Sequence, residues 1–353
     1  MLVRSKKSAS RAVDAAIASI ETKTVPSSVL LLNGVGMGNQ GAQALARALP
    51  LRPTRTVTEL RAAHNYISDA GAASLARHGH ALSVLVLSAN EIGDGGASAL
   101  GRMLRGKRVA TAVLGLWGND IGEEGALALA RGLRKARGLE QLDLGFNPSM
   151  GGVGVRSLAK GLVGHPGLRV LNLSRNQLDD AAIRSLAKGL VSNASLAVLD
   201  LSRNAIGDPG AKHLAKVFYA KRCALASLNL RSNPITNHGA RHLLRARSQT
   251  RSGMLDINVR GSTGSPPVDP NVQSQLRSWS VVHDTIAFEF GEPGAPASNA
   301  WASSRRRSHK KGKTPKPRKA RRKARKAQKA QKAREARKGK GKGKGKGKGK
   351  GKR

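Results

Sequence analysis

The chain has 353 residues, of which 39% are apolar and 3% aromatic, so a core can form but must consist mainly of aliphatic side chains. Cys223 is the only cysteine, which excludes an internal disulfide and favours a reducing, intracellular compartment. The formal net charge is +42, and residues 301–353 account for +26 of it, with 27 Lys/Arg against one acid. Such a charge indicates polyanionic partners rather than a fold.

The N-terminal segment, residues 1–26, precedes the main pattern of the chain. Val13, Ile17 and Ile20 fall at helical spacing, so we expect a flank or a short capping helix here. A Ser/Ala-rich organelle transit peptide is the alternative, although two acidic residues in the segment speak against it. No apolar run in the chain approaches the roughly 18 residues of a membrane span.

From residue 27 to residue 260, one block recurs about every 28 or 29 residues, eight times in register. In the clearest copy Leu199 and Leu201 alternate, as in a short strand with one buried face. Ala211 and Leu214 follow at helical spacing. Elements this short cannot bury an apolar face alone, so neighbouring copies must cover it.

Each copy reads approximately L-x-x-L-x-L-x-x-N-x-I, followed by G-A-x-x-L-A, with Ala181-Ala182 in place of Gly-Ala in the sixth. Seven copies keep the asparagine: Asn65, Asn90, Asn119, Asn147, Asn176, Asn204 and Asn233. This pattern resembles the leucine-rich repeat family, specifically the ribonuclease-inhibitor-like class. The resemblance implies an α/β repeat solenoid, a horseshoe with parallel strands on its concave face and helices on its convex face. It also implies that the asparagines bind backbone between turns.

The composition changes after the last repeat. Residues 261–304 read as a linker, and 281–290 alternate in a way that allows either a strand capping the solenoid edge or a loosely ordered segment. Residues 305–353 are of low complexity and end in seven Gly-Lys pairs and an arginine. We expect this Lys/Arg-rich tail to be disordered.

One glycine motif has the spacing of a dinucleotide site. Gly36, Gly38 and Gly41 follow an apolar strand, and Glu59 lies where a ribose-binding acid would be expected. However, Gly41 also occupies the helix-start glycine position of the repeat, which explains it without a nucleotide. The histidines show no metal spacing, so we predict no metal, no cofactor and no catalytic residue.

The concave face is where specificity is expected, because its residues vary between repeats. Trp117 and Phe146 fall on neighbouring strands and face outward, in a chain that has few aromatics. Aromatic and Arg side chains are frequent anchors of interfaces, although both rings could instead fold over the strand leucines. The predicted partner site, including a mixed-charge patch, consists of Trp117, Asp143, Phe146, Asn172, Arg175, Asp200, Arg203 and Arg231.

The basic tail carries clusters suited to phosphate backbones and to nuclear import. The predicted polyanion-binding residues are Arg305, Arg306, Arg307, Lys310, Lys311, Arg318, Lys319, Arg321, Arg322 and Lys323. The tail is similar to the Lys/Ala-rich tails of linker histones and some ribosomal proteins. Acidic membrane lipids are a weaker alternative, because no apolar anchor accompanies the charge.

Together these features predict a monomeric, non-enzymatic scaffold. Its concave face would bind a protein partner, and its tail would attach to nucleic acid or another polyanion in the nucleus. The alternative is regulation of a small GTPase, since Ran GTPase-activating proteins use the same class of repeat. Those proteins typically carry an acidic tail, whereas this tail is basic.

Overall fold

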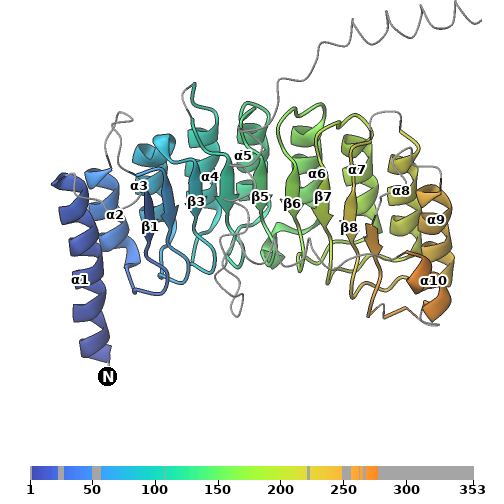
Figure 1. The fold of residues 1–353 in the computed structure, drawn as a ribbon, viewed down its shortest axis with the longest axis horizontal. Coiled ribbons are helices and arrows are strands. Elements are labelled where there is room, and N and C mark those ends of the chain that lie inside the picture. The colour runs from blue at the N-terminus through green and yellow to red at the C-terminus, as the bar shows by residue number, and fades with distance from the viewer. Residues whose placement is uncertain are drawn as a thin grey trace, which may run out of the picture. The chain divides into compact units, whose positions relative to one another are not determined.

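The computed structural model describes residues 2–22, 28–49, 57–107, 109–220, 223–248, 256–261, 263–264 and 268–276. Short strands alternate with helices throughout this part of the chain (Figure 1). The strands are β1 (Val29–Leu31), β2 (Glu59–Arg61), β3 (Val84–Val86), β4 (Val113–Gly115), β5 (Gln141–Asp143), β6 (Val170–Asn172), β7 (Val198–Asp200), β8 (Ser227–Asn229) and β9 (Asp256–Asn258). The helices are α1 (Leu2–Glu21), α2 (Gly38–Ala48), α3 (Asp69–His78), α4 (Asp94–Leu104), α5 (Glu123–Leu133), α6 (Gly151–Leu162), α7 (Asp180–Leu190), α8 (Asp208–Phe218), α9 (Asn237–Arg247) and α10 (Pro270–Gln275). Two 3₁₀ turns are η1 (Gly79–Ala81) and η2 (Pro148–Met150).

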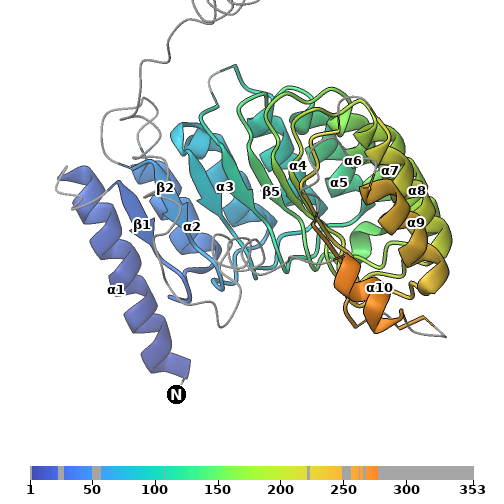
Figure 2. The ribbon, with the colours of Figure 1, turned by 45° about the vertical axis from the view of Figure 1, so that its right-hand side comes forward.

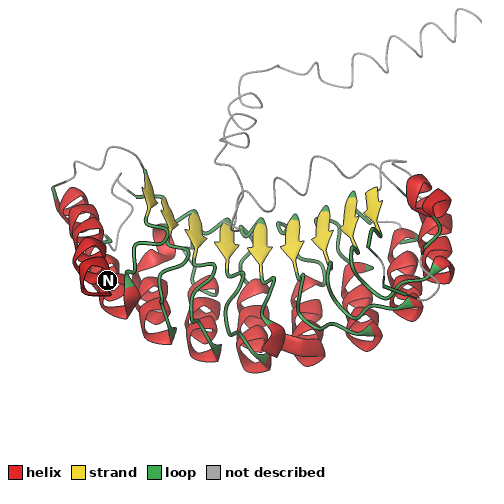
Figure 3. Cartoon of the chain, turned by 90° about the horizontal axis from the view of Figure 1, so that it is seen from below, coloured by secondary structure: helices red, strands yellow, loops and turns green. Residues whose placement is uncertain are grey.

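The strands pair in parallel and in chain order, so the nine described strands form one sheet from β1 to β9. Equivalent residues of the repeat are opposite one another: Leu199 of β7 pairs with Leu171 of β6 and Leu228 of β8. The strands line the concave side of the arc and helices α2 to α9 line its convex side (Figure 3). The structure therefore confirms the α/β repeat solenoid.

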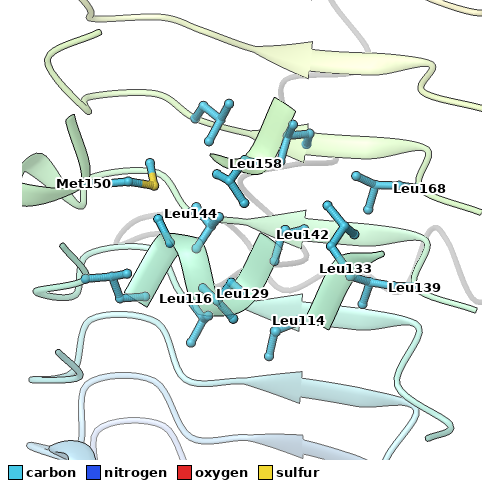
Figure 4. Packing of buried hydrophobic residues seen from close by; sticks show 14 of the residues in the cluster. Leu114, Leu116, Leu129, Leu133, Leu139, Leu142, Leu144, Met150, Leu158 and Leu168 are labelled. Atoms are coloured by element: carbon cyan, nitrogen blue, oxygen red, sulfur yellow. The ribbon is translucent and has the colours of Figure 1, made fainter. Parts of the chain in front are cut away.

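The core fills the space between the strand layer and the helix layer. Leu114 lies in β4 and Leu116 follows directly after it. Both side chains pack in the core with Leu129 of α5 (Figure 4). All three side chains are fully buried. Burying a leucine contributes roughly 1.5–3 kcal/mol, and the contribution recurs in each repeat.

The repeat asparagines connect successive turns of the solenoid. Asn147 Nδ2 donates to the carbonyl oxygens of Leu116, Leu144 and Gly145, each at 3.1 Å. Its Oδ1 accepts the backbone N–H of Ile121 in the preceding repeat at 3.1 Å. Cross-repeat bonds of the same kind are made by Asn65, Asn90, Asn119, Asn176, Asn204 and Asn233.

Acidic residues at the helix starts make a second set of cross-repeat bonds. Oδ1 of Asp180, the first residue of α7, accepts the backbone N–H groups of Gly207 and Gly210 at 2.8 Å each. The carboxylate therefore caps α8, whose first N–H groups lack intrahelical acceptors. Equivalent bonds from an Asn or Asp to the next helix are made by Asn39, Asp69, Asp94 and Asp208.

These caps explain the glycine that begins each helix motif. A Cβ atom on Gly210 would lie 2.5 Å from Oδ1 of Asp180 and 2.6 Å from Cγ2 of Ile206. The sixth repeat differs, and here the predicted alignment was wrong by one residue. Ala182 and Ile183 are buried at the Gly-Ala positions. An alanine fits here because α6 has no acidic residue in its first turn, and Asp179 of the same repeat accepts the N–H of Ala182 instead, at 2.8 Å.

Both ends of the described solenoid are covered. Val13, Ala16 and Ile20 of α1 join the core beside the first repeat. At the other end α10 lies beside α9 (Figure 2), and Val268 and Leu276 are buried. The sequence had placed Val268 and Leu276 in a linker, so that expectation was wrong for these residues, whose apolar side chains cover the last repeat. The possible cap at 281–290 lies outside the described residues.

Candidate functional site

One residue of each repeat, just before the ladder asparagine, has a positive φ. Phe146 (φ 51°), Arg175 (φ 57°) and Arg203 (φ 55°) hold this position in three consecutive repeats. A left-handed conformation is uncommon for residues other than glycine and costs about 1–2 kcal/mol. Because the same backbone geometry recurs, these side chains leave the solenoid from equivalent points at the ends of neighbouring strands.

Trp117, Phe146 and Arg175 form a stack across three repeats, which we call the aromatic–arginine stack. The ring centroids of Trp117 and Phe146 lie 5.4 Å apart, with their planes tilted by 37°. The guanidinium carbon of Arg175 lies 5.5 Å from the centroid of the Phe146 ring, within the range of a cation–π contact. Phe146 remains 43% exposed, which leaves an aromatic surface available to a partner.

Trp117 is held in a space that a glycine leaves open. A Cβ atom on Gly145 would lie 2.7 Å from Cδ1 of Trp117 and 2.9 Å from both Nδ2 of Asn172 and Oγ of Ser174. The indole Nε1 is buried and has no hydrogen-bond acceptor among the described residues. A buried donor without an acceptor is costly and unusual in a folded protein.

The polar residues expected beside the aromatics are placed differently from the prediction. Asp143, Asn172 and Asp200 are 0%, 2% and 5% exposed, so they do not form an exposed mixed-charge patch. Their Oδ1 atoms accept the backbone N–H two residues onward: Asp143 from Gly145, Asn172 from Ser174 and Asp200 from Ser202. These residues close the strand ends and belong to the scaffold, because a side chain here is well placed to satisfy that N–H.

Arg203 and Arg231 are exposed, and each comes from a repeat further along the solenoid. Of the predicted partner residues, the structure therefore brings Trp117, Phe146 and Arg175 into contact and leaves Arg203 and Arg231 as exposed cations on the next repeats. The basic tail and its predicted polyanion-binding residues lie outside the described part of the chain.

The remaining motifs have structural explanations. Gly36 and Gly38 have positive φ values of 66° and 59°. A Cβ atom on Gly41 would lie 2.7 Å from Cγ of Met37, so the first repeat needs a glycine here for its own packing. No group of three metal-binding side chains occurs among the described residues. Within the same residues, no helix is both long and apolar enough to cross a membrane.

One histidine is part of the scaffold. Nε2 of His165 lies 3.1 Å from the carbonyl oxygen of Ala136, and Nδ1 accepts the N–H groups of Gly167 and Leu168. Burial is the main reason that the pKa of His165 is lowered, and backbone contacts oppose the shift. The ring is therefore neutral, with its proton on Nε2.

Asn193 fills the equivalent place in the next repeat. Its Nδ2 donates to the carbonyl of Leu162, and its Oδ1 accepts the N–H groups of Ser195 and Leu196.

The Asp caps and the scaffold role of Asp143 were missed from the sequence. The signal for the caps was an acid two residues before the repeat glycine, as in Asp69-Ala70-Gly71. The signal for the strand-end role was an Asp or Asn at one register in five consecutive repeats, namely Asp143, Asn172, Asp200, Asn229 and Asn258.

Comparisons with known proteins agree with the fold. The model of the leucine-rich repeat family matches residues 80–101, 137–159, 166–187 and 192–215. No curated protein sequence matches the chain. The four matched segments and the nine-strand parallel sheet show that the chain is built from leucine-rich repeats. Membership of the ribonuclease-inhibitor-like class stays a prediction.

Several solved structures are similar in fold. The internalin inlF of Listeria monocytogenes is 18% identical, with a TM-score of 0.43, and the match covers 74% of this chain and 66% of that one. Internalin C2 of the same organism is 19% identical, with a TM-score of 0.40, over 67% of this chain and 80% of that one. The yeast Rad7–Elc1 complex contains a chain that is 15% identical, with a TM-score of 0.39, over 73% of this chain and 75% of that one.

Proposed function

We propose that this protein is a non-enzymatic interaction scaffold that binds a protein partner through the aromatic–arginine stack of its concave face. The observation that carries the proposal is the half-exposed ring of Phe146, set between Trp117 and the guanidinium of Arg175. Aromatic and arginine side chains supply much of the binding energy of protein interfaces. A solenoid presents them on a rigid frame, so little ordering cost accompanies binding.

The two ends of the stack suggest what the partner offers. Arg175, together with the exposed Arg203 and Arg231, suits acidic side chains. Nε1 of Trp117, which has no acceptor in the part of the chain that the structure describes, suits a carbonyl or carboxylate oxygen, provided that the ring shifts enough to admit one. The expected ligand is therefore an acidic segment of a protein that carries an apolar side chain for the exposed ring.

Affinity capture with the double variant Trp117→Ala/Phe146→Ala tests this site. The variant should lose the captured partner while its circular dichroism spectrum stays that of a folded solenoid. Tyr66→Ala is the control, because Tyr66 is an aromatic that is 70% exposed in another repeat. An unchanged set of captured proteins would exclude the stack as the partner site.

We also propose that the tail attaches the complex to nucleic acid or another polyanion and directs it to the nucleus. The support is the density of bases in residues 301–353, 27 Lys/Arg with one acid. If about ten of these bases contact DNA phosphates, the slope of log affinity against log salt should be near −9. Deletion of 301–353 should make the slope much shallower, and an unaltered slope contradicts this role.

Binding without catalysis is part of the proposal. A panel of Ras-like GTPases tests the alternative reading directly, because a GTPase-activating protein accelerates hydrolysis by orders of magnitude. We expect the hydrolysis rates to stay unchanged when the full chain is added. A large acceleration of any GTPase in the panel would replace the scaffold proposal with a regulatory one.

A further inference from the structure

The convex surface carries a regular column of bases. In every repeat helix from α2 to α9, an exposed Arg or Lys follows the Leu-Ala of the motif or its equivalent. In the first four helices these residues are Arg47, Arg77, Arg102 and Arg131. In the last four they are Lys160, Lys188, Lys216 and Arg245. All eight lie in the last turn of their helix, where a cation interacts favourably with the helix dipole. Helix stability alone therefore explains this column.

A second column has no such explanation. Helices α6 to α9 carry another exposed base one turn earlier, namely Arg156, Arg184, Lys212 and Arg241. These positions lie away from the helix C-terminus, so the dipole does not favour them. Each also faces a like charge four residues onward, which destabilises a helix. Four consecutive helices share this unfavourable pairing, whereas Gln43, Ala73, Ser98 and Leu127 occupy the same position in α2 to α5.

The described acids of these helices are engaged in backbone contacts. The acids of α7 and α8, Asp180 and Asp208, lie at the helix starts, where they accept backbone N–H groups of the next repeat. No ion pair with a described residue is formed by the eight exposed bases of α6 to α9, namely Arg156, Lys160, Arg184, Lys188, Lys212, Lys216, Arg241 and Arg245. The pKa of His213 is lowered, first by burial and then by Lys216 and Arg184, and Asp180 opposes the shift.

We propose that these eight bases of α6 to α9, the convex basic array, bind the sugar–phosphate backbone of a nucleic acid. Neighbouring helices pack about 8–10 Å apart, so four of them span about 24–30 Å, or about seven to nine base pairs of 3.4 Å each. Two parallel columns on a rigid surface can contact several phosphates at once without reading bases. The array belongs to the folded solenoid, so this inference does not depend on the tail.

An anionic membrane is the competing ligand. Val163, Val191 and Tyr219 are exposed near the ends of α6, α7 and α8 and would favour it. Three isolated apolar side chains, however, give a small buried area compared with the apolar face of an interfacial helix. Nucleic acid needs only the charges and is favoured for that reason.

Two full-length variants with equal charge loss test the array on a 20-bp duplex. The array variant is Arg156→Gln/Arg184→Gln/Lys212→Gln/Arg241→Gln. The control is Arg47→Gln/Arg77→Gln/Arg102→Gln/Arg131→Gln. If each lost base contacted one phosphate, the array variant should make the salt slope shallower by about 3–4, and the control should leave it near the wild-type value. Equal effects of the two variants would overturn the proposal.

Chemical footprinting of the full-length wild-type protein shows which lysines the duplex covers. It therefore locates the contact even if the tail contributes most of the affinity. A 20-bp duplex should protect Lys188, Lys212 and Lys216 from acetylation, and it should leave the exposed Lys107 and Lys135 of the other half reactive. Protection by phosphatidylserine vesicles but not by the duplex would overturn the nucleic-acid assignment. Equal reactivity of all five lysines with and without the duplex would overturn the site.

Discussion

Gly145 leaves the space that the indole ring of Trp117 occupies, since a Cβ atom there would lie 2.7 Å from Cδ1 of the ring. We therefore expect Gly145→Ala to displace Trp117 and weaken its contact with Phe146. An aromatic pair is worth about 0.5–1.5 kcal/mol beyond burial, so the protein should lose about that much stability. Partner affinity should fall as well, because the ring of Phe146 loses the neighbour that holds it. The indole N–H signal of Trp117 in an NMR spectrum should shift even without a partner.

Gly138→Ala is the control for this substitution, because a Cβ atom on Gly138 meets nothing within 4 Å. It should change neither the signal nor the affinity. If Gly145→Ala behaved in the same way, the glycine would not be what positions the ring.

The second prediction concerns the helix caps. Gly210→Ala should destabilise the protein by about 1–3 kcal/mol, because the added methyl group overpacks against Asp180 and Ile206. Gly152→Ala is the matched control: it is also in the first turn of a helix, and its Cβ would meet Ala182 at an ordinary 3.5 Å. That change should be neutral or stabilising, by about 0.4–1 kcal/mol. Urea unfolding distinguishes the two, and equal midpoints would contradict the role of the cap.

The third prediction concerns the asparagine ladder. Asn147→Ala removes the three bonds that its side chain donates to backbone carbonyl groups and the one bond that it accepts from a backbone N–H. Each buried group left unsatisfied costs about 1–3 kcal/mol, so a loss of about 3 kcal/mol or more is expected. Ser185→Ala, which removes one exposed bond to Ala181, should cost little. A small loss for both variants would mean that water replaces the ladder contacts.

The fourth prediction is a pH dependence caused by His165. Its folded pKa is lowered, so between that value and the ordinary value of about 6.5 the unfolded chain binds more protons. The neutral ring therefore contributes full stability above about pH 6.5, and this contribution is lost as the pH falls toward the folded pKa.

His165→Asn tests this by copying the contacts that Asn193 makes in the next repeat. The free energy of unfolding, measured with urea, should fall for the wild type as the pH is lowered from 7.5 to 5.0. It should fall less for the variant, so the variant should become more stable relative to the wild type. If the free energies of unfolding of the two proteins changed equally with pH over this range, the titration of His165 would not be coupled to folding.

The fold was predictable from the sequence because every repeat has the same spacing of strand leucines and asparagine. Leu199, Leu201 and Asn204 recur at one spacing, and a single strand and helix can satisfy that spacing only by stacking. Contacts between repeats were harder to predict. Asp180 is an ordinary helix-start acid until the next repeat places Gly207 and Gly210 beside it.

The candidate site was predictable only in part. Trp117 and Phe146 were found because their register puts them on neighbouring strands. Asp143 and Asp200 were expected to be exposed, but their short side chains accept a local N–H and are buried. The convex basic array was not predicted, because its two columns emerge only when the helices are aligned side by side.

The interrupted series of helix caps has a consequence for how the solenoid unfolds. Asp94 caps α5 and Asp180 caps α8 across a repeat boundary, whereas α7 is capped by Asp179 of its own repeat. In a repeat protein the interface between neighbours sets how far cooperativity extends. We therefore expect the boundary between α6 and α7, which lacks a cross-repeat cap, to open more readily in native-state hydrogen exchange than the boundary that Asp180 bridges.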